Sequence, residues 1–151
     1  FGLPPRVRAE ALWREARVLV VRAGHPLADR ESISILDTND EVFVAVAKGV
    51  PDVVDWWIVD PRPDGPPPKR GPSADSAEGL LELVAAGAGV NIAGESASRH
   101  YRREELAFIP IVDIEPATIV LCSLSDARNP MVNTFRETAI ALSPLVDATF
   151  H

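Results

Sequence analysis

Hydroxyl and carboxylate side chains stand directly before a segment whose apolar residues recur at helical spacing. Ser73, Asp75 and Ser76 precede the run that begins near Ala77. The first turn of a helix has unpaired N–H groups and a positive end, so these residues are suited to holding an anionic carboxylate. Asp75 favours a ligand that also carries a hydrogen-bond donor. The alternative is simple capping, in which the side chains accept the helix's own N–H groups.

Two further polar residues follow apolar segments elsewhere in the chain. Ser96 comes shortly after the apolar segment 90–93, where it either contacts the same ligand or caps the helix that follows. Lys48 follows the apolar segment 41–46 and supplies a positive charge there, unless it is simply solvated. Together with the preceding group, these residues form the candidate binding set.

The residues that usually bind metals do not occur in groups. His25, His100 and His151 are scattered without ligand spacing, and Cys122 stands alone in an apolar segment. A structural zinc site needs four such ligands at short, regular intervals. The sequence therefore predicts no metal site.

Catalytic groupings are also missing from the sequence. The step Gly87-Ala88-Gly89 follows a helical segment and lacks a third glycine, whereas a dinucleotide-binding loop follows a strand. Asp113 and Glu115 fit solubilising charges at an exposed strand edge. We therefore expect no catalytic residue and no cofactor.

The composition is that of an ordinary globular chain with an acidic balance. The chain has 151 residues, 46% of them hydrophobic and 25% charged, with a net charge of -7. Negative charge repels a phosphate backbone, so this chain by itself is not expected to bind nucleic acid. One cysteine cannot form an internal disulfide, and no apolar run reaches the roughly 18 residues of a membrane span. The first residues do not resemble a signal peptide.

Short apolar runs alternate with segments of helical spacing along the chain. Strands are predicted over 18–21, 41–46, 90–93, 106–112 and 117–122, and helices over 53–59, 76–87, 94–101 and 131–142. Such alternation favours an α/β fold with a mostly parallel sheet. Ligands of these sheets lie beyond the carboxyl ends of strands, near helix N-termini. That rule points to the loops after Val46, before Ser76 and after Ala93.

Three other segments have less regular patterns. Residues 12–15 are compatible with a helix, and residues 32–39 suggest a short helix capped by Asp29 or Ser32. Residues 60–68 are rich in proline, which lacks an N–H group, so we expect a stiff exposed loop that extends to Pro72 within a single domain.

Three motifs in order resemble a known family. The segment 18–28, which contains His25-Pro26-Leu27-Ala28, is similar to the "HPLA" signature of LysR-type transcriptional regulators. The segment 81–90 resembles that family's "lVaaGlGv" element, and the segments 96–101, 108–113 and 129–135 continue in family order. The resemblance covers roughly residues 10 to 142, with departures at Asn91 and Gly94.

The resemblance implies a fold similar to type 2 periplasmic binding proteins. The chain would hold mainly the second effector-binding subdomain, with a mixed, mostly parallel sheet flanked by helices. Residues 1–17 would be a remnant of the first subdomain and the approach to the hinge, and residues 18–116 the second effector-binding subdomain. Residues 117–151 would be the return strand and a C-terminal helix that packs toward the first subdomain.

The function implied by the resemblance is that of an effector-sensing domain in a transcriptional regulator. A small molecule would bind in a cleft between subdomains, beside Ser73, Asp75, Ser76, Ser96 and Lys48, and its presence would reach a winged helix-turn-helix that this chain lacks. DNA would be bound only through that missing domain. The full-length protein would be a cytoplasmic homodimer or homotetramer without membrane contact, with the helix 76–87 contributing to pairing. The alternative is a stand-alone periplasmic-type solute-binding protein of the same fold.

Overall fold

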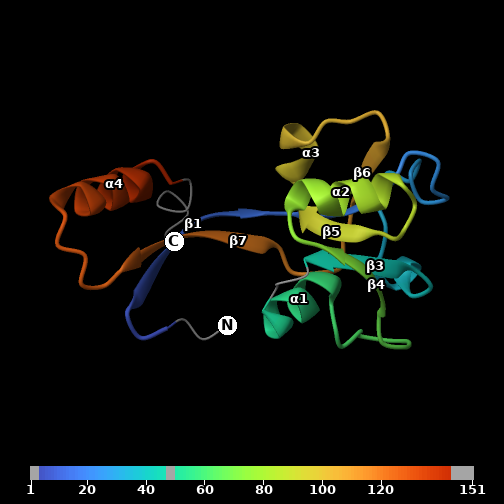
Figure 1. Cartoon of the computed structure of the whole chain (residues 1–151), viewed down its shortest axis with the longest axis horizontal. Coiled ribbons are helices and arrows are strands. Elements are labelled where there is room, and N and C mark those ends of the chain that lie inside the picture. Colours follow the sequence, from blue (N-terminus) through green and yellow to red (C-terminus); the bar gives the residue numbers. More distant parts are fainter. Residues whose placement is uncertain (1–3, 47–49, 144–151) are drawn as a thin grey trace, which may run out of the picture. The chain divides into compact units, whose positions relative to one another are not determined.

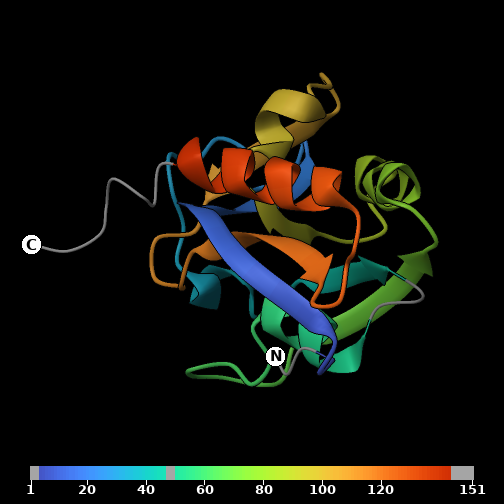
Figure 2. The same ribbon diagram turned by 90° about the vertical axis from the view of Figure 1, so that its left-hand side faces the viewer.

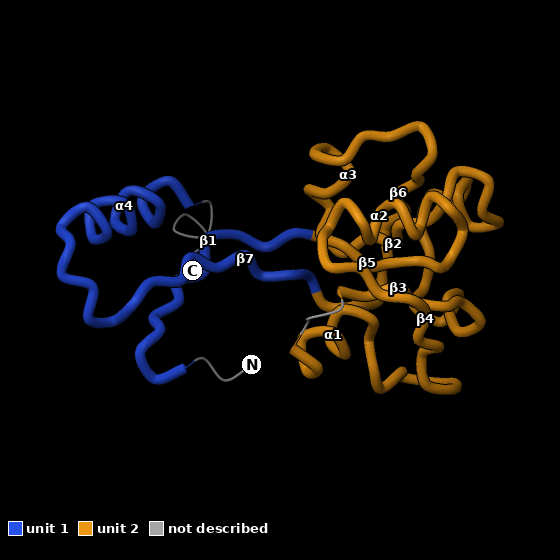
Figure 3. The backbone as a smooth tube through the Cα atoms, viewed as in Figure 1, with its two compact units in different colours: residues 1–15, 116–151 blue, residues 16–115 orange. Residues whose placement is uncertain are grey.

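The computed structural model describes residues 4–46 and 50–143, and the chain divides into two compact units (Figure 3). Unit 2 is the continuous segment 16–115, and unit 1 combines residues 1–15 with residues 116–151. The chain therefore enters unit 2 at Ala16 and leaves it at Glu115. No helix among the described residues is long and apolar enough to cross a membrane.

The elements follow one another in a strand and helix alternation within unit 2 (Figure 1). Unit 2 contains β2 (Arg17–Arg22), η1 (Ile35–Thr38), β3 (Val42–Val46), α1 (Pro51–Ile58), β4 (Lys69–Ala74), α2 (Ala77–Ala85), β5 (Asn91–Gly94), α3 (Ala97–His100) and β6 (Leu106–Pro110). Unit 1 contains β1 (Val7–Glu15), β7 (Ala117–Leu124) and α4 (Pro130–Ala141). The predicted α/β class is confirmed.

The strands of unit 2 pair in both directions. β2 lies between β5 and β6 and is antiparallel to both, whereas β3 and β4 are parallel. A parallel bridge between Phe43 and Val90 joins β3 to β5, so β3, β4, β5 and β6 point the same way and β2 runs in the opposite direction. The expected mixed, mostly parallel sheet is therefore confirmed for the described strands of unit 2. β5, α3 and β6 form a strand–helix–strand unit whose two strands point the same way, and β2 is inserted between them in the opposite direction. Sequence alternation cannot reveal such an insertion.

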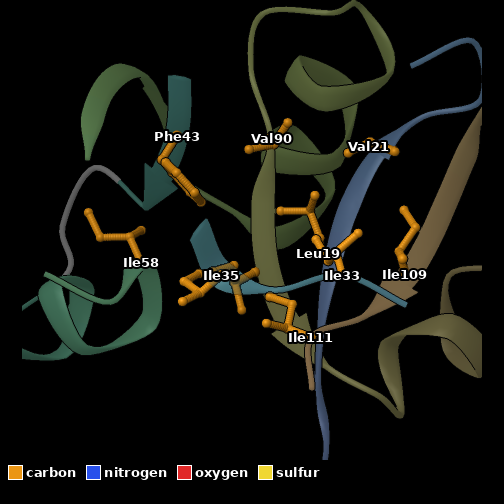
Figure 4. Close-up of a cluster of buried hydrophobic side chains, with 10 residues drawn as sticks. Leu19, Val21, Ile33, Ile35, Phe43, Ile58, Val90, Ile109 and Ile111 are labelled. Carbon is orange, nitrogen blue, oxygen red and sulfur yellow. The ribbon is translucent and has the colours of Figure 1, made fainter. Parts of the chain in front are cut away.

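The core of unit 2 has apolar clusters on both faces of β2. Leu19 and Val21 belong to a cluster with η1 and the end of α1, while Val20 packs with α2 on the other side. Figure 4 shows the first cluster converging between the strands and α1. Burial on both faces explains why residues 18–21 form an uninterrupted apolar run rather than an alternating one.

Local signals set most of the helix ends. α1 begins at Pro51, two residues before the predicted segment 53–59, because proline suits a first helical position. Ser76 caps α2, with its Oγ accepting the Gly79 N–H at 3.1 Å, and Gly87 follows the helix in the left-handed region at φ 78°. Asn129 caps α4 in the same way as Ser76 caps α2, through the Met131 N–H.

Two segments differ from their predicted structures. Residues 12–15 belong to β1, because they pair antiparallel with β7. The strand β4 begins at Lys69, inside the segment expected to be an irregular proline loop up to Pro72. The pairing of β4 with β3 shifts register between Phe43 and Ala45, and Gly71 and Pro72 are the residues of β4 left unpaired by this shift. Because β4 is an edge strand, this interruption leaves no central strand unpaired.

The short helix η1 is present, but its cap is neither Asp29 nor Ser32. Ser34 caps it, and the carboxylate of Asp113 accepts both the Ser34 hydroxyl and the Ile35 N–H, the latter at 2.8 Å. Asp113 is therefore a structural acceptor rather than a solubilising charge. Burial acts to raise the pKa of Asp113, but these hydrogen bonds outweigh it and the pKa is lowered.

Unit 1 is a two-stranded antiparallel ribbon with a helix beside it (Figure 2). Arg136 of α4 donates to Glu10 of β1 at 2.8 Å, and both side chains are largely buried. The predicted helix over 131–142 is confirmed, and its apolar residues Phe135 and Leu142 are 67% and 80% exposed.

Candidate functional site

Unit 2 contains a cavity of about 430 Å³ between its strands and helices. It is bounded by the carboxyl-terminal part of β3, by the whole of β5, by α1, by parts of α2 and by α3 with the residue after it. Its lining residues are Val44, Ala45, Val46, Val53, Val54, Trp57, Ile58, Ala77, Leu80, Leu81, Asn91, Ile92, Ala93, Gly94, Ala97 and Tyr101. Cavities of this size accommodate small organic molecules.

The position of the cavity follows from how the chain turns at the strand ends. β3 ends at Val46 and β5 at Gly94, while α2 begins at Ala77 and α3 at Ala97. All four of these residues line the cavity. Val46, Ala77 and Gly94 adjoin the three loops that the sequence singled out, as expected for a site beyond strand ends.

The lining is almost entirely apolar. Among the described lining residues none is charged, and the polar side chains are those of Asn91 and Tyr101. Asn91 Nδ2 donates to the Val44 carbonyl at 3.1 Å, which ties β5 to β3 at the cavity wall. Such a surface favours a ligand with an apolar body, because a buried charge without a partner is costly.

The described residues of the predicted binding set are not among the residues that line the cavity. Ser73 is exposed in β4, Asp75 is exposed in the turn that follows, and Ser76 caps α2 immediately before Ala77. Ser96 is half-buried immediately before Ala97, and its carbonyl lies 2.8 Å from His100 Nδ1. None of these four is a lining residue. Lys48 lies outside the described residues.

Sequence reasoning missed most of the cavity wall, including the face of α1. Val53, Val54, Trp57 and Ile58 line the cavity from this helix. The adjacent pair of tryptophans was the one available signal, since neighbouring helical side chains point about 100° apart and cannot share one environment. Trp57 lines the cavity, while the ring of Trp56 lies beneath a guanidinium.

That guanidinium belongs to Arg17, a buried cation to which no sequence motif points. Arg17 is 2% exposed, and its Nη2 donates to the carbonyls of Trp56 and Trp57 at 2.7 and 2.6 Å. Its carbon Cζ lies 4.0 Å from the centre of the Trp56 ring. Burial lowers the pKa of Arg17 to about 10, and the charge of Glu115 opposes that effect. The side chain therefore remains a cation at neutral pH.

Solved structures show the same fold. The effector-binding domain of QuiR in complex with shikimate superposes with a TM-score of 0.73 at 23% identity, covering 97% of this chain and 68% of that one. The BenM effector-binding domain with its effector benzoate gives 0.74 at 18% identity, covering 100% and 69%. HinK, a LysR family transcriptional regulator from Pseudomonas aeruginosa, gives 0.76 at 15% identity, covering 94% and 50%.

Sequence comparison identifies the family. No curated protein matches the chain. The family model described as the LysR substrate binding domain matches residues 2–143, nearly the whole chain. The resemblance seen in the "HPLA" and "lVaaGlGv" motifs is confirmed, and with it the expected type 2 periplasmic-binding-protein-like fold. The chain belongs to the family of LysR substrate-binding domains, the effector-binding modules of LysR-type transcriptional regulators.

Proposed function

We propose that unit 2 senses a small-molecule effector in its 430 Å³ cavity and has no catalytic role. The cavity itself carries the proposal, because it lies beyond the strand ends of an α/β sheet, where ligands of such sheets bind. The family match supports this role over that of a stand-alone solute-binding protein.

The lining points to the chemistry of the ligand. The effector we propose has an apolar body, ring-like or branched, that packs against Trp57 and the aliphatic wall. A small polar end would lie at the rim, where Ser76 and Ser96 directly precede lining residues. Ser73, Asp75 and Lys48 are proposed as further rim contacts. Shikimate and benzoate, the ligands of the related domains, are ring compounds of suitable size for a first test.

We further propose that the effector acts by population shift. A ligand that binds one arrangement of the effector-binding module more tightly than another moves the equilibrium toward it, by no more than the difference in affinity. In this proposal unit 2 corresponds to the second subdomain, expected at 18–116, and unit 1 joins the expected segments 1–17 and 117–151. The regulator would act in the cytoplasm as a homodimer or homotetramer, paired partly through α2, and would bind DNA through an N-terminal domain outside this chain.

The test is a thermal-shift panel with a matched pair of variants. Benzoate, shikimate, phenol and benzyl alcohol are added to the chain and to its Ala97→Trp and Arg99→Trp variants. Ala97 lines the cavity, whereas Arg99 lies two residues further along α3 and is exposed outside it. A ligand at about 100 times its Kd adds about 2.7 kcal/mol, which raises Tm by roughly 5 to 10 °C in a chain of this size.

The expected result is a Tm shift that Ala97→Trp abolishes and Arg99→Trp retains. Equal shifts in both variants would place the binding site elsewhere. A panel without any shift, extended to apolar compounds of the same size, would contradict the proposed ligand class.

A further inference from the structure

The buried cation Arg17 lies at the point where the chain enters unit 2. It is the first residue of β2 and the second of unit 2, whose last residue is Glu115. The backbone there is tied to both neighbouring strand ends. The Ala16 carbonyl accepts the Glu95 N–H at 2.8 Å, and the Arg17 carbonyl accepts the Ile111 N–H at 3.1 Å.

The side chain of Arg17 reaches the carboxyl end of α1. Its two hydrogen bonds go to carbonyls of the last turn, where unpaired oxygens and the helix dipole favour a cation. The guanidinium also stacks on Trp56, and it lies 5.4 Å from the centre of the Trp57 ring. Only a planar cation with several donors can bind two carbonyls and stack at once, so lysine is not an equivalent replacement.

Trp56 connects Arg17 with Glu115, the residue at which the chain leaves unit 2. Its indole Nε1 donates to Glu115 Oε1. The rings of Trp56 and Trp57 meet edge to face, with centroids 5.0 Å apart and planes at 80°. One tryptophan of this pair therefore touches the two chain crossings, while the other lines the cavity.

Stability alone is a poor explanation for this arrangement. A buried cation loses its hydration, and the Nε of Arg17 has no hydrogen-bond partner among the described residues. Apolar residues of similar volume often replace such buried charges without loss of stability. The contacts instead link two places, the cavity wall at Trp57 and the crossings at Ala16 and Glu115.

We propose that Arg17 is a positioning residue that transmits occupancy of the cavity to the two chain crossings of unit 2. A molecule packed against Trp57 displaces the last turn of α1. The carbonyls of that turn hold the guanidinium, so the displacement reaches β2 directly and reaches Glu115 through Trp56. The proposal rests on the proposed function only in treating the cavity as the effector site.

The test uses a tethered occupant, so it does not depend on the affinity of any ligand. In the chain with Cys122→Ser, which removes the native thiol, Ala77→Cys is labelled with benzyl methanethiosulfonate and, for comparison, with the methyl reagent. Ala77 lines the cavity and is exposed enough to react. Glu78→Cys, exposed and outside the cavity lining, receives the same labels as a control. Mass spectrometry confirms complete labelling.

The readout is amide hydrogen exchange, measured residue by residue by NMR at Glu95 and Ile111, whose N–H groups bond the crossing at Ala16 and Arg17. With Arg17 present, the benzyl label at position 77 should change both exchange rates by about fivefold relative to the methyl label. The control label should leave both rates within about twofold.

Two variants distinguish transmission of cavity occupancy through Arg17 from a purely structural role of its side chain. In Arg17→Gln the exchange rates rise with either label, but their benzyl-to-methyl ratio should fall to within about twofold of one. Trp56→Phe keeps the aromatic ring under Arg17 and removes the donor to Glu115. Both amides bond to the β2 side, which Arg17 reaches directly, so both should keep their response in this variant. Arg17→Lys, which cannot bind both carbonyls and stack at once, serves if Arg17→Gln fails to fold.

An unchanged benzyl-to-methyl ratio in Arg17→Gln, or loss of the response at either amide in Trp56→Phe, would overturn the proposal. So would an absence of any response with Arg17 intact. Because the occupant is covalent, these outcomes are independent of the ligand panel, which tests the proposed function separately.

Discussion

Replacement of Gly89 by alanine tests the packing that forms the cavity. A Cβ at this position would lie 2.5 Å from the Val42 carbonyl oxygen and 3.0 Å from Val44 Cγ1. Ordinary contact begins near 3.4 Å, so the segments must separate by about 0.9 Å (3.4 less 2.5). The oxygen concerned is not a flexible side-chain end but part of the backbone of β3, and it cannot move alone.

That separation weakens the link between β3 and the start of β5. The Val90 N–H donates to the Val42 carbonyl at 2.8 Å, and the Val44 N–H donates to the Val90 carbonyl at 2.9 Å. Two such bonds contribute about 1 kcal/mol each. Overpacking adds about 1 to 3 kcal/mol, and the reduced freedom of the unfolded chain returns less than about 1 kcal/mol. We expect Gly89→Ala to lower the free energy of unfolding by about 3 kcal/mol.

Urea unfolding followed by tryptophan fluorescence measures this loss, since the chain has three tryptophans. The control is Gly24→Ala, whose new Cβ would meet only the Arg22 NH1 atom at 3.1 Å, the end of a flexible side chain. The free energy of unfolding of the control should stay within about 0.5 kcal/mol of the wild-type value. A Gly89→Ala variant that unfolds at the same urea concentration as the control would refute the argument from close approach.

Three smaller perturbations have expected outcomes of their own. Gly87→Ala should cost about 1 to 2 kcal/mol in urea unfolding, because its φ of 78° lies in the left-handed region; a cost near zero would show that the turn can change its conformation. Ser76→Ala should cost about 1 kcal/mol through loss of the α2 cap, whereas Ser73→Ala, in the exposed edge strand, should cost little, and equal costs would contradict this assignment. Asp113 has a folded-state pKa below its unfolded value, so its stabilising effect is present above the unfolded pKa of about 4 and is lost as pH falls through the folded pKa. The stability difference between wild type and Asp113→Asn should therefore shrink as acid is added below about pH 5, and a difference that does not vary with pH would disprove this linkage.

Elements with local causes could be predicted from the sequence alone. Residues 18–21 form a strand because they are β-branched and apolar, and α1 starts at Pro51 because proline suits a first helical position. The cap at Ser76 and the left-handed Gly87 also follow from neighbouring residues alone. Family membership could also be predicted from the sequence, because three short motifs occur in order.

Only part of the candidate site could be predicted from the sequence. The strand ends at Val46 and Gly94 and the helix starts at Ala77 and Ala97 line the cavity, next to the loops that the sequence singled out. The described polar residues chosen in those loops are not among the lining residues, and the wall is made mainly by apolar residues such as Trp57 and Ile92. Apolar side chains look alike in a sequence whether they fill a core or line a hollow, so their role depends on what packs opposite them.

Tertiary structure decided the remaining features because they depend on partners distant in the chain. The direction of β2 between β5 and β6 and the pairing of β4 with β3 are long-range choices. Asp113 is an acceptor because η1 lies against it, 78 residues away, and Arg17 is buried because the end of α1, 39 residues away, offers two carbonyls. A polar side chain buried in this way is stable only once its partner is in place, and no local pattern records the partner.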